Sequence, residues 1–188
     1  RQRQSRGEIA QVWLPARAYG DYAYAAQAWG LRQVQDPQAA QLLWACEPSS
    51  PLGQAHSLWP AWLHQPHGTP QPPDTQLVLD CAYTPLQLQG KSSLTDVQRD
   101  KVWCLWTPNK ALGLTGVRAA YAIAPLHADA TVQSLQALAP SWPVGAHGVA
   151  MLHNWVQADT QAWLAQCRSQ LQVWKPRQLA ALENLGWE

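Results

Sequence analysis

The sequence predicts an α/β protein with a doubly wound, mostly parallel β-sheet, followed by a long helix that leads to a second domain. Two observations carry this prediction. Short apolar runs recur between Pro, Gly and Asp residues, and they are continuous rather than alternating, as in strands buried on both faces. Helix-like stretches lie between the runs, and strands that alternate with helices favour a layered α/β fold.

Five apolar runs are predicted to be strands. In chain order they are VWL (12–14), QLLWAC (41–46), QLVLD (76–80), VWCLW (102–106) and AYAIA (120–124). Between the first two, GDYAYAAQAWG (20–30) is a predicted helix that Gly30 can end, because glycine readily adopts the left-handed conformation found there. The segment HQPHGTPQPPD (64–74) is rich in Pro and predicts an exposed connection.

Beyond Pro125 the pattern becomes helical. DATVQSLQALA (129–139) is a first predicted helix, and the two prolines that follow it end it. The stretch 146–175 contains no Pro and a single Gly, which predicts one helix of about 30 residues. Pro176 can then begin a further helix, because proline is well tolerated at the first helical position.

The composition excludes several classes of partner. The 188-residue chain has a formal net charge of +1 and 13% charged residues, so neither nucleic acid nor a membrane surface is expected to bind it. No apolar run approaches the roughly 20 residues that cross a bilayer. The six histidines include no i, i+4 pair on a predicted helix, so no metal site is expected.

The four cysteines are predicted to be small residues of the core. They are Cys46, Cys81, Cys104 and Cys167, and no two of them form a CxxC pair. Three lie inside apolar runs, where a free thiol behaves as a small hydrophobic group. Unpaired buried thiols favour a reducing compartment, and so the cytoplasm.

Candidate site residues follow the predicted strands, where ligands bind in parallel sheets. The strand 102–106 leads to Thr107 and Lys110, with Arg118 eight residues further on. Glycines lie between Lys110 and Arg118, so the amine and the guanidinium are expected to project from the same loop. A lone amine in a cleft indicates a Schiff base, and a hydroxyl and an arginine around it indicate a phosphate.

Other strand ends add an acid and aromatic rings. The strand 76–80 ends in Asp80, with Tyr83 three residues later, and Tyr19 follows the first strand. A carboxylate can pair with a cationic ring nitrogen, and a phenol can hydrogen-bond a ring oxygen. Together with the lysine loop, these groups meet the needs of pyridoxal phosphate (PLP).

These segments resemble the large domain of fold-type I, class I/II aminotransferases, in the branch of histidinol-phosphate aminotransferase and threonine-phosphate decarboxylase. DCAYTPL (80–86) is similar to the family's Asp-Glu-Ala-Tyr strand end, and TPNKALGLTGVRAAYAIAP (107–125) is similar to its lysine stretch. VWLPARAYGDY (12–22) is similar to its Pro-x-Tyr segment. CEPSSPLG (46–53) stands where Asn-Pro-x-Asn-Pro-x-Gly is usual. The resemblance covers residues 8–186.

The resemblance implies that Lys110 forms the Schiff base with PLP and later moves the proton at the α-carbon of the substrate. It also implies contacts to the pyridinium nitrogen (Asp80), the phenolic oxygen (Tyr83 and Ser50), the phosphate (Thr107 and Arg118) and the ring face (Tyr19). Lys110 is therefore the predicted catalytic residue, and all seven side chains are predicted to bind the cofactor.

Four positions depart from the pattern of the family. Ser50 stands in place of the usual Asn, and its hydroxyl can still donate a hydrogen bond with a shorter reach. Glu47 stands at the first Asn position, Cys81 replaces a Glu and Ala120 replaces a Gly. The resemblance further implies that the phosphate-binding helix start of the family precedes residue 1 and that its substrate-carboxylate arginine follows residue 188.

The resemblance implies a PLP-dependent aminotransferase that acts on an amino acid or amine and is a homodimer when full length. It implies an incomplete PLP-binding large domain (1–145), an interdomain helix (146–175) and the start of a small domain (176–188). Two alternatives stay open. One is a PLP-dependent decarboxylase of a phosphorylated amino acid, as in cobalamin biosynthesis, and the other is a non-catalytic PLP-binding sensor module.

Overall fold

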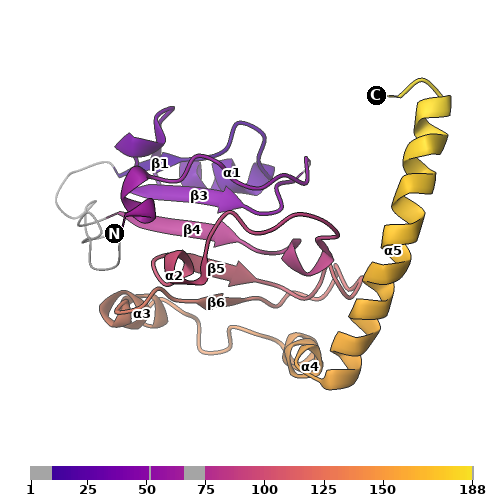
Figure 1. Cartoon of the computed structure of the whole chain (residues 1–188). Helices are drawn as coiled ribbons and strands as arrows, with labels where there is room; N and C mark the ends of the chain where they lie inside the picture. Colours follow the sequence, from indigo (N-terminus) through magenta and orange to yellow (C-terminus); the bar gives the residue numbers. More distant parts are fainter. Residues whose placement is uncertain (1–9, 51, 66–74, 188) are drawn as a thin grey trace.

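The computed structural model describes residues 10–50, 52–65 and 75–187, which form a six-stranded sheet with helices around it (Figure 1). The strand order is β2-β1-β3-β4-β5-β6. All neighbouring strands are parallel except β6, which is antiparallel to β5. The strands are Gln11–Trp13 (β1), Arg32–Gln33 (β2), Leu42–Cys46 (β3), Gln76–Asp80 (β4), Trp103–Trp106 (β5) and Tyr121–Ile123 (β6). The mostly parallel α/β sheet predicted from the sequence is confirmed.

The two edge strands differ from the central ones. β2 is polar and exposed, so no apolar run predicted it, and it forms through backbone bonds such as Val34 N–H to the Val12 carbonyl at 2.9 Å. β6 was predicted as a strand buried on both faces. It is a strand, but all three of its residues are exposed, including Tyr121 and Ile123.

Helix α1 (Gly20–Ala28) follows β1 and ends as the sequence predicts. Gly30 has a φ of +64°, and its N–H donates to the Gln27 carbonyl at 3.0 Å. The N–H of Leu31 donates to the Ala26 carbonyl at 2.9 Å, which completes a Schellman motif. This helix end turns Leu31 back onto the same apolar cluster that buries Ala26.

Short helical segments shape the loops between the strands. They are Pro37–Ala39 (η2), Ala61–His64 (η3), Thr84–Leu86 (η4) and Asp96–Arg99 (α2). α2 begins with a capping box, in which Gln98 N–H donates to Thr95 Oγ1 at 3.3 Å and Thr95 N–H donates to Gln98 Oε1 at 2.9 Å. In the Pro-rich connection predicted for 64–74, residues 66–74 lie outside the described residues.

The C-terminal helices depart from the prediction. Helix α3 (Asp129–Gln136) lies where it was expected, but residues 146–175 do not form one helix. They are divided between α4 (Ala146–Trp155) and α5 (Ala158–Asn184), because Gln157 is extended, with a ψ of 141°. The side chain of Gln157 stabilises this break, since its Nε2 donates to the His153 carbonyl near the end of α4 at 3.1 Å.

Pro176 was predicted to begin a helix, but it lies inside α5. Proline has no N–H to offer the carbonyl four residues earlier, which belongs to Gln172. Both residues are exposed, so water can bond that carbonyl and the helix continues. Figure 1 shows α5 running beyond the edge of the sheet to the C-terminus.

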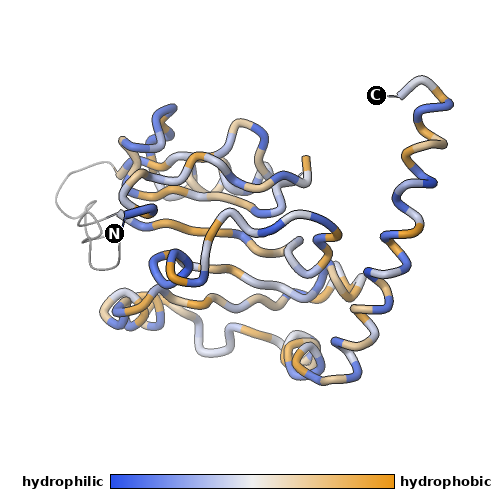
Figure 2. The backbone as a smooth tube through the Cα atoms, viewed as in Figure 1, coloured by the Kyte–Doolittle hydropathy of each residue, from blue (hydrophilic) through white to orange (hydrophobic). Residues whose placement is uncertain are grey.

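The centre of the sheet is buried on both faces. On β3, Leu43 and Ala45 belong to one apolar cluster, while Leu42 and Trp44 pack in another. The first cluster includes Leu63 of η3, and the second includes α1. Figure 2 shows hydrophobic stretches along these central strands. The prediction of strands buried on both faces is confirmed for β4, where Leu77, Val78 and Leu79 are all buried, whereas on β3 Leu42 and Trp44 are half-buried.

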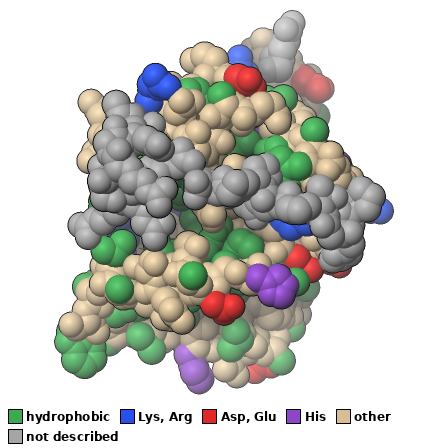
Figure 3. Space-filling view, turned by 90° about the vertical axis from the view of Figure 1, so that its left-hand side faces the viewer, with side chains coloured by type: hydrophobic (Ala, Val, Ile, Leu, Met, Phe, Trp, Pro, Cys, Tyr) green, Lys and Arg blue, Asp and Glu red, His purple; other side chains and the backbone are tan. Residues whose placement is uncertain are grey.

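Three further features concern the surroundings of the protein: the state of its cysteines, the character of its helices and the charges on its surface. Cys46, Cys81 and Cys104 are buried as predicted, Cys167 is half-buried, and all four are free thiols. Among the described residues, no helix has both the length and the apolar character needed to cross a membrane. The described part of the face at the amino ends of the strands carries scattered charges of both signs (Figure 3).

Candidate functional site

Asp80 is the last residue of β4 and lies at the carboxyl edge of the sheet. Its carboxylate accepts hydrogen bonds from the Tyr22 hydroxyl at 2.6 Å and from the Ala82 N–H at 2.9 Å. These two donors hold the carboxylate in one orientation, and hydrogen bonds to a charged group are strong ones. Asp80 is half-buried, so a ligand can still reach it.

Tyr22 is a site residue that the sequence reasoning missed. Burial, together with the hydrogen bond to Asp80, raises the pKa of the Tyr22 hydroxyl, so this group remains a donor at neutral pH. Its ring packs on Trp44, with 5.1 Å between ring centroids. The available signal is the spacing to Tyr19, because residues three apart at the start of a helix lie on one face.

Lys110 lies in the turn after β5 and is half-buried. The turn is held by Leu114 N–H, which donates to the Asn109 carbonyl at 2.8 Å, and by Gly113, whose φ of +67° suits glycine. Lys110 Nζ lies 5.9 Å from the centroid of the Tyr83 ring. The structure therefore brings together two of the residues that the sequence placed in one site.

Thr107 closes the base of the lysine loop. Its hydroxyl donates to the Ala119 carbonyl at 2.7 Å and accepts a bond from Asn109 N–H at 3.4 Å. These contacts tie the start of the loop to its end, where Arg118 lies next to Ala119. Arg118 is exposed, so its guanidinium can reach a ligand from the solvent side.

Tyr19 immediately precedes α1, and 59% of its surface is exposed. Its ring packs edge-on against Tyr22, with 5.9 Å between centroids. A hydrogen bond with Asp21 is the main cause that raises the pKa of Tyr19, and the charge of Arg118 acts in the opposite direction. The exposed ring of Tyr19 can pack on a flat ligand.

Ser50 and Tyr83 line the same cavity, which has a volume of about 380 Å³. The turn that carries Ser50 is closed by Gly53 N–H, which donates to the Ser49 carbonyl at 2.7 Å. Gly53 has a φ of +66°, which a residue with a side chain adopts at a cost. The structure therefore brings Ser50 beside Tyr83, and so into the neighbourhood of Lys110.

Glu47 has a structural role that the sequence did not indicate. It is buried, and its carboxylate accepts bonds from His56 N–H at 3.0 Å, from Ser93 N–H at 2.7 Å and from the Ser93 hydroxyl. Burial alone would raise the pKa of Glu47, but the bonds from Ser93 and His56 outweigh it and lower the pKa. Glu47 therefore fixes the loops behind the site rather than facing a ligand.

The predicted residues gather at the carboxyl ends of β1, β3, β4 and β5. Within the described residues, no hydrogen bond joins Lys110 to Asp80, so the amine and the carboxylate are held separately, each at the end of its own strand. In this described part, no three His, Cys, Asp or Glu side chains are grouped so that they could hold a metal ion.

No family model and no curated protein matches the chain, but solved structures do. A Corynebacterium diphtheriae protein assigned as a PLP-dependent β-cystathionase is 21% identical, with a TM-score of 0.66 over 87% of this chain and 48% of that chain. An Erwinia carotovora atroseptica protein assigned as a histidinol-phosphate aminotransferase is 18% identical, with a TM-score of 0.64 over 94% and 56%. L-threonine-O-3-phosphate decarboxylase from Porphyromonas gingivalis is 17% identical, with a TM-score of 0.59 over 82% and 51%.

These three structures share the fold of the chain but have different activities. The chain spans about half the length of each of them. At these identities, the TM-scores of 0.59 to 0.66 show a shared fold. The chain therefore has the fold of the large domain of fold-type I PLP-dependent aminotransferases.

Proposed function

We propose that the chain is the cofactor-binding part of a PLP-dependent aminotransferase that acts on an amino acid or amine. The observation that carries this proposal is the Lys110 amine, 5.9 Å from the Tyr83 ring, at the same sheet edge as a carboxylate fixed by two donors. Lys110 has no carboxylate partner within the described residues, so its amine can bond an aldehyde. The fold supports the same conclusion.

The residues of the site fit PLP. Bound PLP supplies an aldehyde and an electron-withdrawing ring. Lys110 would hold the aldehyde carbon and, once the amine of the substrate had displaced it there, would take up and return the proton at the α-carbon of the substrate. Asp80 would keep the ring nitrogen protonated, because a fixed carboxylate favours a neighbouring cation. The other groups would hold the phenolic oxygen (Tyr83 and Ser50), the phosphate (Thr107 and Arg118) and the ring face (Tyr19).

One of these roles requires a local change. The hydroxyl proton of Thr107 bonds the Ala119 carbonyl, so Thr107 must exchange this bond to donate to a phosphate. Arg118 needs no such exchange, because its guanidinium is exposed and has no carboxylate partner among the described residues. We therefore expect Arg118 to contribute more to phosphate binding than Thr107.

The proposal is tested by visible absorption of the purified protein with PLP, followed by borohydride reduction and peptide mapping. We expect an absorption band and a reduced label on Lys110. Lys110→Ala should abolish the label, whereas Lys175→Ala, at an exposed position of α5, should leave it unchanged. A label that persists in Lys110→Ala would overturn the assignment.

A decarboxylase of a phosphorylated amino acid is the second candidate. It is favoured by the similarity of the chain to L-threonine-O-3-phosphate decarboxylase. The identity and TM-score of that match are close to those of the match to the Erwinia protein assigned as a histidinol-phosphate aminotransferase. Lys110 and Asp80 serve both reactions, which differ in the α-carbon bond that breaks. Incubation of the full-length protein with phosphothreonine separates them, since release of carbon dioxide supports the decarboxylase and transfer of the amino group to a 2-oxo acid supports the aminotransferase.

The same proposal leads to expectations for the substrate, the oligomeric state and the cellular compartment. We expect a small-molecule amino acid or amine as the substrate and a homodimer for the full-length protein. The free and mostly buried cysteines support a reducing compartment, and we place the protein in the cytoplasm. Size-exclusion chromatography with light scattering on the full-length protein tests the dimer.

A further inference from the structure

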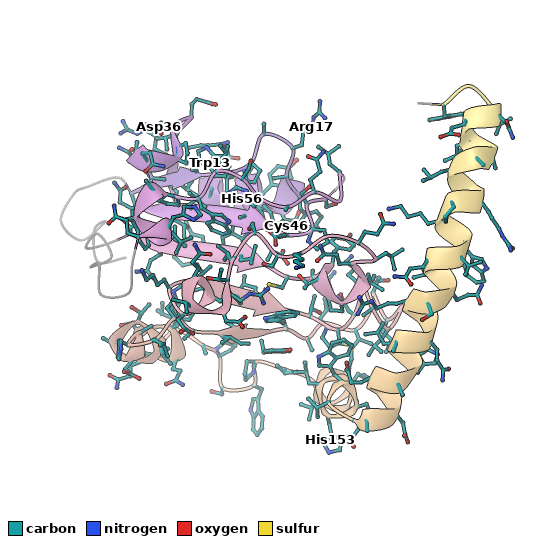
Figure 4. The ribbon with its side chains drawn as sticks, in the orientation of Figure 1. Trp13, Arg17, Asp36, Cys46, His56 and His153 are labelled. Atoms are coloured by element: carbon teal, nitrogen blue, oxygen red, sulfur yellow. The ribbon has the colours of Figure 1, made fainter. Side chains whose placement is uncertain are left out.

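A larger cavity opens in the loops that follow β1 and β3. Its volume is about 700 Å³, within the range of small-molecule sites. Figure 4 labels Trp13, His56 and Cys46 in the middle of this region, and Arg17 on the loop beyond the end of β1. Ser49 lines this cavity and also the smaller one beside Tyr83, so the two spaces are neighbours.

The lining of this cavity favours an anion. No Asp or Glu is among the described residues that line it, whereas Arg17 and several side-chain amides are. The guanidinium of Arg17 is exposed and has no carboxylate partner within the described part of the chain. The nearby carboxylate of Glu47 is occupied by its bonds to His56 and Ser93. A guanidinium in this setting is suited to bind a carboxylate through two parallel hydrogen bonds.

His56 is a fixed part of the wall of this cavity. Its ring packs between Trp13 and Trp59, with centroid distances of 5.6 Å and 4.6 Å. Its Nε2 atom is buried and has no hydrogen-bond partner within the described residues. Burial also lowers the pKa of His56, so the imidazole is neutral at neutral pH. A buried atom offers no surface to a molecule in the cavity, so the neutral ring of His56 acts as an uncharged part of the cavity wall.

Much of the rest of the lining is apolar. Trp13, Leu14 and Pro15 line the cavity on the side of β1, and Leu52 and Leu58 belong to the loop after β3. Trp13 and Leu14 are 6% exposed, so this side is a fixed wall of the core rather than a mobile surface. Apolar walls with a few polar groups are typical of sites that bind small organic molecules.

We propose that this cavity binds a small organic carboxylate with an apolar or aromatic body. The carboxylate pairs with Arg17 at the mouth, and the body lies against Trp13, Leu14 and Pro15. The site depends on its own lining and not on Lys110 or a bound cofactor. This proposal can therefore be tested independently of the proposed transamination.

The test compares phenylacetate with phenylacetamide, which has the same shape but no charge. Calorimetric titration of the 188-residue protein, without PLP, should show that phenylacetate binds about tenfold more tightly, as one charge-assisted pair implies. Arg17→Met should reduce this preference to about twofold or less, and Arg17→Lys should keep part of it. Arg177→Met, at an exposed site on α5, is the matched control and should keep all of it.

A second variant tests the cavity itself. Ala55 lines the cavity at an exposed position, so Ala55→Trp should narrow the cavity without disturbing the core. Phenylacetate and phenylacetamide should then both lose most of their affinity. The proposal is overturned if phenylacetate does not bind, if both probes bind equally well to the unaltered protein, or if Arg17→Met keeps the preference. Unchanged binding in Ala55→Trp would place the probe elsewhere and would also overturn it.

Discussion

At the scale of single residues, the hydrogen bond between Tyr22 and Asp80 is the contact that most directly positions a proposed functional group. Tyr22→Phe removes this bond at 2.6 Å but keeps the ring on Trp44. We expect a loss of roughly 1.5–3 kcal/mol in the free energy of unfolding, measured in urea, because one hydrogen bond to a charged group is lost. Tyr24→Phe in the same helix is the control, since Tyr24 is 72% exposed, and an equal loss there would contradict the prediction.

Glu47 leads to a prediction about pH. Its folded pKa is lowered by the bonds from Ser93 and His56, so the folded state binds fewer protons at this site than the unfolded state. Its contribution to stability is therefore present above the unfolded pKa, near 4.3, and is lost as pH falls through the lower folded pKa.

Glu47→Gln should remove this contribution and lower the free energy of unfolding at neutral pH by roughly 1–3 kcal/mol. The difference between the two proteins should shrink as the pH falls below the unfolded pKa, near 4.3, because the unfolded state then binds a proton at Glu47 that the folded state does not. Urea unfolding across this range measures the difference. A difference that stays constant over the whole range would show that Glu47 does not act through its charge.

The sequence indicated some of these residues and not others, for a physical reason. Asp80, Tyr83 and Lys110 follow predicted strands, so their place at the sheet edge follows from strand direction alone. Tyr22 and Glu47 act through partners that are 58 and 46 residues away in the chain. Such pairs depend on how the elements pack, and no local pattern contains that information.

At the scale of elements, the end of α1 shows local chemistry that can be predicted and tested. Gly30 has a φ of +64°, where a side chain is strained. Gly30→Ala should therefore lower the free energy of unfolding by about 1 kcal/mol. Gly116→Ala is the control, because Gly116 has open space around it and no positive φ. Equal effects in urea unfolding would show that the cap of α1 carries no special strain.

Elements without a local signal were predicted less well. The central strands β3, β4 and β5 were found because burial gives them continuous apolar runs. The polar strand β2 forms only because β1 offers its backbone, which leaves no trace in side-chain type. The break between α4 and α5 contains neither Pro nor Gly, and Pro176 continues a helix because its surroundings are exposed.

At the scale of the whole molecule, the described residues leave large apolar side chains in contact with solvent. On α5, Trp163 and Trp174 are 46% and 55% exposed, and Leu185 at its end is 74% exposed. These positions are eleven residues apart, which is close to three helical turns, so they form a stripe along one side of the helix, with the polar Gln170 between the two tryptophans. The chain spans about half the length of its structural neighbours, and this stripe is a surface on which a further domain or a second copy can pack.

The 188-residue chain should therefore associate with itself through this stripe. We expect its sedimentation coefficient to rise with protein concentration, because pairing two stripes removes apolar surface from water. The double substitution Trp163→Gln and Trp174→Gln should weaken the association, since both residues lie outside the buried clusters and the fold should persist. Trp142→Gln is the matched control, because Trp142 is 91% exposed but precedes α4 and is not on the stripe. Association that is unchanged in the double variant, or equally weakened in the control, would show that exposed tryptophan in general, and not this face of α5, brings the copies together.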